Sequence, residues 1–199
     1  MLLYNSPVSG NCYKVRLLLA HLGVGYERVE VDVVDRSRRE AVIGRDRNPA
    51  LRVPTLVLDD GRALAESNAI LWWLGEGTPY VPDDRFERAQ VLQWQFFEQY
   101  DHEPNVAVAR FWLTKRPGEV DRERLELWHA GGHRALAAME HHLAARPFLV
   151  GERYSIADIS LFAYTHVAHE GGFDLAPYPG VRAWLDRVAA QPGYVRIDA

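Results

Sequence analysis

The sequence feature that most constrains the fold is the stretch from Arg52 to Trp73. It holds two short β-branched and apolar runs, Thr55 to Leu58 and Arg62 to Ala65, separated by Asp60-Gly61. An Asp-Gly pair between two such runs is a strong hairpin signal. Apolar residues at helical spacing follow directly after Ser67. The stretch therefore predicts a strand, a tight turn, a second strand and a helix that begins at a serine.

The residues before this stretch predict a small α/β layer. Leu2 to Asn5 reads as a strand, and a helix is expected from Cys12 to Leu22. Tyr26 to Val31 alternates like a second strand, and the arginine-rich stretch from Arg36 to Arg47 is weakly helical. The resulting order is strand, helix, strand, helix, strand, strand, helix, which is typical of a thioredoxin-like α/β domain.

The second half of the chain predicts an all-α domain. Residues 79–84 contain two prolines and read as a linker. Residues 85–115 and 121–145 then have long helical patterns, the first of them with a kink expected at its proline. We therefore expect two domains, residues 1–77 and residues 85–199.

A helix-capping pattern is the clearest local signal in the helical half. Ser155 and Asp158 stand at N-cap and N3 spacing, so the aspartate can act as the shorter partner of a capping box. Tyr154 and Ile159 are spaced as a hydrophobic staple around the same helix start. We interpret this pattern as structural and not as catalytic.

Composition and charge narrow the class of protein. Of the 199 residues, 48% are hydrophobic and 25% are charged, which is ordinary for a soluble globular protein. The net charge of −4 provides no basic field for nucleic acid or for an anionic membrane. Cys12 is the one cysteine, so no intrachain disulfide is possible and a reducing compartment is indicated. With no signal peptide or membrane span in view, we expect a cytoplasmic protein.

Two features of the central stretch have a structural and a chemical interpretation. Ser67 can simply cap its helix. Alternatively, the helix N-terminus can hold a carboxylate while the adjacent Glu66 pairs with an ammonium group, as a zwitterionic ligand requires. If the Val53–Pro54 bond is cis, the Val53 N–H and C=O become available at a sheet edge, where a peptide ligand can pair like an added strand.

Residues 48–56 and 64–70 resemble the glutathione-binding core of cytosolic glutathione transferases, in particular the bacterial, serine-type members. The resemblance implies that Pro54 follows a cis bond and that the main chain of Val53 pairs with the cysteinyl part of glutathione. It also implies that Glu66-Ser67 holds the γ-glutamyl end.

The resemblance extends over nearly the whole chain but has two departures. Residues 148–151, the capping pattern at Ser155 and residues 179–184 fit the helical domain of the same family. Leu51 stands where many members have glycine, and Asn68 stands where some classes have arginine. Neither departure removes a group that would hold the ligand.

The implied reaction is attack by the glutathione thiolate on a small hydrophobic electrophile. A free thiol has a pKa near 8.5, so lowering it by about two units requires roughly 2.7 kcal/mol of preference for the anion. One charge-assisted hydrogen bond contributes about 1.5–3 kcal/mol, and a helix N-terminus adds about 0.3–1 kcal/mol. A single well-placed hydroxyl at the start of the first helix is therefore nearly sufficient.

The candidate for this hydroxyl is Ser9, in the loop before the first helix, where serine-type transferases have their activating group. From the residues alone, Ser9 can equally be an N-cap. Asn11 stands where the serine classes often have proline, and its amide is an alternative donor to sulfur. Cys12 is a third candidate, because cysteine-type members use a thiol for disulfide exchange, but it lies on the predicted buried stripe. Ser6 is a lesser contender.

Further contacts follow from the resemblance. Arg52 is a candidate for the glycyl carboxylate of glutathione, although a solvated arginine is an equal alternative. Val8 and Phe111 are expected to line the pocket of the second substrate. His129 and His133 have the i, i+4 spacing of helical metal ligands, but without a third ligand we interpret them as a solvated helix face.

The sequence thus predicts a homodimeric glutathione transferase with a function such as detoxification. It requires no metal or dissociable cofactor, and glutathione serves as co-substrate. One alternative is a non-catalytic interaction module of the same fold. Another is a glutathione-dependent thiol transferase that uses Cys12.

Overall fold

A computed structural model describes all residues from 1 to 199. The chain divides into two units, the first formed by residues 1–78 with 192–199 and the second by residues 79–191. The segment 192–199 thus packs with the α/β part of the chain, whereas the sequence analysis placed it at the end of the helical part.

The first unit is built on a four-stranded sheet with the strand order β2-β1-β3-β4. β1 (Leu2–Asn5) pairs in parallel with β2 (Glu27–Glu30) and antiparallel with β3 (Thr55–Val57). β4 (Ala63–Ala65) pairs antiparallel with β3, with Leu56 opposite Leu64. This mixed sheet is the predicted thioredoxin-like layer.

The predicted hairpin between β3 and β4 is confirmed. The Leu58 N–H donates to the Arg62 carbonyl at 2.8 Å, and the Gly61 N–H donates to the Leu58 carbonyl at 3.0 Å. Gly61 has φ +86°, a left-handed conformation that favours glycine. The loop is therefore a turn closed by a left-handed residue, a common three-residue hairpin connection.

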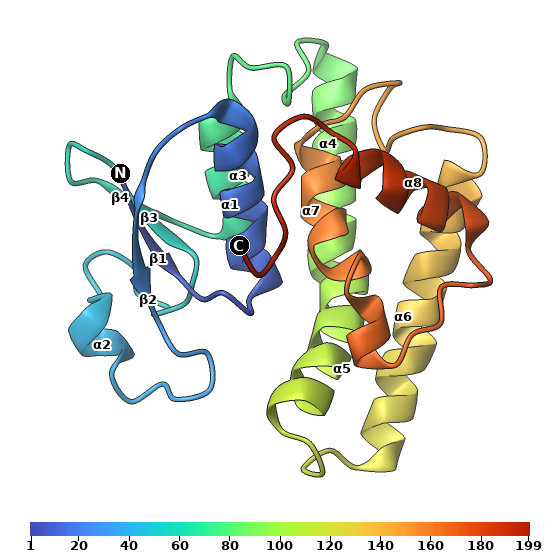
Figure 1. The fold of residues 1–199 in the computed structure, drawn as a ribbon, viewed down its shortest axis with the longest axis horizontal. Helices are drawn as coiled ribbons and strands as arrows, with labels where there is room; N and C mark the ends of the chain where they lie inside the picture. Colours follow the sequence, from blue (N-terminus) through green and yellow to red (C-terminus); the bar gives the residue numbers. More distant parts are fainter. The chain divides into compact units, whose positions relative to one another are not determined.

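Helices cover both faces of the sheet. α1 (Gly10–Leu22) and α3 (Ser67–Gly75) lie side by side on one face, and α2 (Arg39–Val42) lies on the other (Figure 1). The arginine-rich stretch forms only this short helix. The buried Arg39 guanidinium donates to the carbonyls of Asp32, Val33 and Leu51 and thereby holds the surrounding loops.

α1 is buried more completely than a single apolar stripe predicts. Every residue from Cys12 to Leu19 is buried, including Lys14 and Arg16. Two cations in the interior require hydrogen-bond partners, since an unpaired buried charge is costly. Their partners connect α1 with distant parts of the chain.

The second unit is a bundle of helices, none of which has the length and apolar content needed to cross a membrane. A π-helical turn interrupts the predicted long helix just before Pro104, which lacks the N–H that would bond to the preceding turn. The elements are α4 (Arg85–Phe97), the π-helical turn (Glu98–His102), α5 (Glu103–Lys115), α6 (Arg122–Leu143), α7 (Ile156–Thr165), a 3₁₀ turn (Ala168–Gly171) and α8 (Pro179–Ala189).

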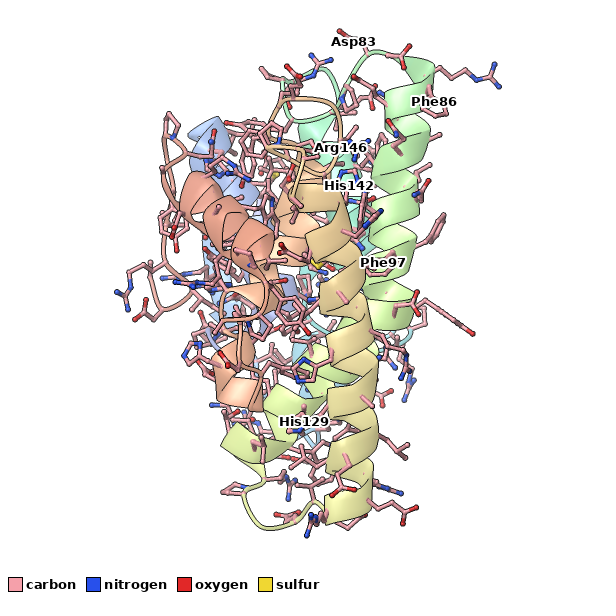
Figure 2. All side chains as sticks on the ribbon, turned by 90° about the vertical axis from the view of Figure 1, so that its right-hand side faces the viewer. Asp83, Phe86, Phe97, His129, His142 and Arg146 are labelled. Carbon is pink, nitrogen blue, oxygen red and sulfur yellow. The ribbon has the colours of Figure 1, made fainter.

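Aromatic rings fill the space between α4 and α6. The Trp94 ring meets the His142 ring edge-on with centroids 4.9 Å apart, and it meets the Phe97 ring in the same manner at 5.4 Å. Figure 2 shows Phe97 and His142 between the two helices. Such edge-to-face pairs stabilise a core beyond the area that they bury.

The capping box at the start of α7 is confirmed. The Ala157 N–H donates to Ser155 Oγ at 3.3 Å, and the Ser155 N–H donates to Asp158 Oδ2 at 2.9 Å. Asp158 is fully buried. The capping residues thus serve the packing of the helical unit, as the sequence predicts.

Candidate glutathione site

Two helix N-termini come together in the first unit. Ser9 is the N-cap of α1, and Ser67 is the first residue of α3. The Ser67 hydroxyl donates to Asn11 Oδ1 at 3.1 Å, and Lys14 Nζ lies 3.5 Å from the same hydroxyl. The structure therefore unites two predicted site segments that are far apart in the sequence. Two helix N-termini beside a buried ammonium form a region suited to an anion.

The start of α3 differs from the simple cap that was one interpretation of Ser67. Glu66 holds the N-cap position and its side chain makes no capping bond. The Ser67 hydroxyl does not cap α3, because it is engaged with Asn11. Glu66 is exposed and has φ 67°, a left-handed conformation that is strained for a residue with a side chain. Strain of this kind clusters at ligand-binding sites.

The segment before β3 has the implied geometry. The Val53–Pro54 bond is cis. Asn48 is buried, and its Nδ2 donates to the Arg52 carbonyl at 2.9 Å and to Thr55 Oγ1 at 2.8 Å. The main-chain N–H and C=O of Val53 make no hydrogen bond within the chain. A peptide ligand can therefore pair with them.

Leu51 is notable in this segment for its backbone conformation, and Arg52 for its exposed side chain. Leu51 has φ 52°, so the conformation accounts for the glycine that many members of the resembled family have there. The Arg52 side chain is exposed, whereas its carbonyl is fixed by Asn48 and Thr55. A solvated guanidinium on a fixed backbone is free to reach a ligand carboxylate.

Ser9 caps α1, since its Oγ accepts from the Cys12 N–H at 3.3 Å. The Ser9 N–H in turn donates to the Ser6 carbonyl at 3.1 Å, which fixes the loop. A hydroxyl that accepts one hydrogen bond retains its own hydrogen as a donor. Ser9 can therefore cap α1 and still donate a hydrogen bond to a ligand sulfur.

Cys12 is fully buried, and the Ser6 N–H donates to its Sγ at 3.3 Å. Burial raises the pKa of the thiol to about 11, although the contacts with Ser9 and Ser6 act in the opposite direction. A nucleophilic cysteine requires the reverse, a lowered pKa and partial exposure. The geometry therefore favours the structural interpretation of Cys12.

The other predicted residues belong to different parts of the chain. Val8 is half-buried in the loop before α1, and Phe111 lies on α5 of the second unit, where its ring meets the Trp112 ring edge-on. His129 Nε2 lies 2.9 Å from the Gly171 carbonyl, and His133 Nδ1 lies 2.9 Å from the Tyr178 hydroxyl. The chain holds no group of three or more His, Cys, Asp or Glu side chains arranged for a metal ion.

Sequence reasoning did not single out Lys14 and Arg16. Both stand inside the otherwise apolar run from Cys12 to Leu19. Their charge within an apolar run is the sequence feature that could have identified them, because long cationic side chains are rarely buried without a specific partner.

Comparison with known proteins decides the family. The model of the glutathione S-transferase N-terminal domain matches residues 3–80, and that of the C-terminal domain matches residues 122–187. A crystal structure of a glutathione S-transferase from Pseudomonas fluorescens is 49% identical, with a TM-score of 0.94 and 98% of each chain covered. The chain belongs to the glutathione S-transferase family. It thus has the fold of these enzymes, a thioredoxin-like domain followed by a helical domain.

Other members of the transferase family have different reactions in their names. A maleylacetoacetate isomerase of Rhizobium meliloti is 32% identical over 94% of this chain and 90% of its own length. The disulfide-bond oxidoreductase YfcG of Escherichia coli is 28% identical over 96% of this chain and 90% of its own length. Membership therefore establishes an enzyme family that uses glutathione, and the names of its members cover more than one reaction.

Proposed function

We propose that this protein is a cytoplasmic glutathione transferase that binds glutathione at the N-termini of α1 and α3. The observation that carries the proposal is the contact between Ser67 and Asn11, which joins the segment expected to hold the tripeptide to the loop expected to activate its thiol. No metal takes part in this function.

Each group of glutathione has a counterpart in the first unit. The γ-glutamyl carboxylate fits the first turn of α3, where Ser67 and the helix dipole favour negative charge. The γ-glutamyl ammonium fits Glu66, and the cysteinyl main chain pairs with Val53 as an added strand does. The glycyl carboxylate is expected to pair with the guanidinium of the exposed Arg52. These assignments orient the thiol towards Ser9.

The Ser9 hydroxyl then donates a hydrogen bond to the sulfur, and this bond favours the thiolate. The thiolate attacks a small hydrophobic electrophile, the second substrate. The residues predicted to contact this substrate, Val8 and Phe111, belong to different units, and their role stays a prediction. The alternative of disulfide exchange through Cys12 is the weaker one, because burial raises the pKa of that thiol.

Replacing Ser67 with alanine is expected to weaken glutathione binding about tenfold. On binding, the Ser67 hydroxyl is expected to turn its one hydrogen from Asn11 to the ligand carboxylate. The variant loses this hydrogen bond to a charged group, worth roughly 1.5 kcal/mol, which corresponds to about a factor of ten in Kd. Titration calorimetry with glutathione measures the effect, and Ser37→Ala, in an exposed loop, is the matched control. A folded wild-type protein that takes up no glutathione would contradict the proposed function.

We propose further that the protein is a homodimer that associates through α4. Four large apolar side chains on this helix and the π-helical turn are exposed: Phe86 by 70%, Leu92 by 41%, Phe96 by 69% and Tyr100 by 84%. Figure 2 shows Phe86 at the outer edge of the helical unit, on the first turn of α4. Several large apolar side chains exposed on one helical segment are a mark of an interaction site.

Replacing Phe96 with glutamate is expected to raise the dimer dissociation constant at least about tenfold, because a charge would be buried opposite its own copy. Light scattering on a sizing column measures the mass, which for wild type should be twice the 22.7 kDa of one chain. Leu127→Glu is the control, since Leu127 is 65% exposed but lies on α6. Dissociation by Leu127→Glu and not by Phe96→Glu would place the interface elsewhere.

A further inference from the structure

Arg16 is a buried cation whose hydrogen bonds all go to main-chain carbonyls. Its side chain lies inside the first unit on α1, and the residue is only 3% exposed. Nη2 donates to the Pro7 carbonyl at 3.3 Å and to the Ile197 carbonyl at 2.6 Å, and Nη1 donates to the Ala199 carbonyl at 2.8 Å. One guanidinium thus joins the loop before α1 to residues about 180 positions further along the chain.

Residues 192–199 form a segment that we name the terminal strap. It runs along α1 (Figure 1), and further α1 side chains hold it. The Tyr13 hydroxyl donates to the Val195 carbonyl at 2.8 Å, and His21 Nδ1 lies 2.8 Å from the Pro192 carbonyl. The strap is therefore fixed to the helix along its length by side-chain contacts.

The other end of the Arg16 contact lies in the loop that carries Ser9. Pro7 is exposed and has no N–H, so its carbonyl is the one main-chain group with which it can be anchored. Ser9 follows two residues later and is tied to Ser6 and Cys12. Arg16 is the side chain that anchors Pro7 from the interior of the unit.

We propose that Arg16 is a positioning residue that couples the terminal strap to the Ser9 loop and so keeps the Ser9 hydroxyl in register with the glutathione sulfur. The planar guanidinium suits this role, because its donors point in fixed directions and can engage two segments at once. The consequence for the reaction rests on the proposed function of Ser9, whereas the coupling itself is a property of the free protein.

Arg28 is a matched control within the same contact. It also donates to the Ala199 carbonyl, at 3.2 Å, but it is exposed and has no contact with the Pro7 carbonyl. Arg28→Gln therefore removes one contact of the strap and leaves all three Arg16 hydrogen bonds in place. Arg16→Gln releases both.

Hydrogen exchange measured by mass spectrometry tests the coupling without any ligand. In Arg16→Gln we expect amides of residues 6–12 to exchange about tenfold faster than in wild type, because local opening follows the loss of anchoring contacts. In Arg28→Gln we expect these amides to be unchanged. Equal exchange of the loop in wild type and in folded Arg16→Gln would overturn the proposal, as would an equal effect of Arg28→Gln.

The same variants are then tested with glutathione bound, using the ultraviolet absorbance of the thiolate. Arg16→Gln should raise the pKa of the bound thiol by about one unit. At a pH below both pKa values this is a tenfold loss of thiolate and lowers kcat about tenfold, while Kd for glutathione changes less than about twofold. A merely structural role would change stability but would leave the thiol pKa unchanged.

A shortened chain that ends at Val195 covers the case in which Arg16→Gln does not fold. It removes the Ile197 and Ala199 acceptors but keeps Arg16 and Pro7, and the same faster exchange of residues 6–12 is expected. Unchanged exchange in this variant would overturn the proposal. If wild type binds no glutathione, the proposed function fails, whereas the exchange measurement still decides whether Arg16 holds the loop.

Discussion

Replacement of Asp158 with asparagine is expected to lower the free energy of unfolding of the protein by about 3 kcal/mol. The Asp158 carboxylate accepts four hydrogen bonds in the interior. They come from the Leu149 N–H at 3.0 Å, the Ser155 N–H at 2.9 Å, the Ser155 hydroxyl at 3.1 Å and the Trp184 indole N–H at 2.9 Å. One side chain thus joins the loop before α7, the α7 cap and α8.

The expected effect is large because asparagine has nearly the shape of aspartate but presents an NH₂ group to donors. A buried donor without an acceptor costs about 1–3 kcal/mol, and at least one of the four is left in this state. Burial raises the pKa of Asp158 to about 6, so the carboxylate is mainly ionised at pH 7.5 and accepts from all four donors there. The substitution therefore removes both charge-assisted bonds and acceptor capacity.

Urea unfolding at pH 7.5 measures the loss. Ser155→Ala is the control, because it removes the cap hydroxyl alone and should cost about 1 kcal/mol. If Asp158→Asn costs no more than Ser155→Ala, the long-range bonds to Leu149 and Trp184 contribute little, and the aspartate serves only the local capping box.

The hydrogen bonds of Asp158 fall into local ones and long-range ones, and the comparison shows which features the sequence predicts. The bonds between Ser155 and Asp158 follow from a local pattern three residues apart, as does the hairpin around Gly61, and both were predicted. The donors Leu149 and Trp184 lie outside the pattern, because a side chain's long-range partners depend on how the helices pack. The capping box therefore predicted the start of α7, but only the part of its stabilising network that lies between Ser155 and Asp158.

The same reasoning applies to the candidate site. The cis bond before Pro54 was expected from the resemblance, and the helix that follows Glu66 was expected from the spacing of apolar residues after it. The contact of Ser67 with Asn11 was not expected, since it requires two helix N-termini to meet. Nor was the burial of Lys14 and Arg16 predicted, because the partners of Arg16 are main-chain carbonyls, which have no signature in the sequence.

Replacement of Ser9 with alanine is expected to lower turnover of a chlorodinitrobenzene-type substrate about 100-fold at a pH below the pKa of the bound thiol. Without the hydroxyl donor, the pKa of the bound thiol should rise by about two units, equivalent to roughly 2.7 kcal/mol. The limb of the pH–rate profile that reports this thiol should move to higher pH by the same amount. Because Ser9 also caps α1, the variant should lose about 1 kcal/mol of stability, so Ser9→Thr, which keeps both hydroxyl functions, should restore most of the rate.

Matched variants of Asn11 and Cys12 distinguish the three candidate groups. Cys12→Ala should leave kcat within about threefold of wild type, because a buried thiol whose pKa is raised to about 11 is not a nucleophile at neutral pH. Asn11→Ala removes the contact with Ser67 and should act mainly on glutathione affinity. If instead Asn11→Ala moves the pH profile and Ser9→Ala does not, the amide is the donor to sulfur. If Cys12→Ala abolishes turnover while Ser9→Ala is active, the enzyme works by disulfide exchange, and the hydroxyl at the start of α1 is a helix cap alone.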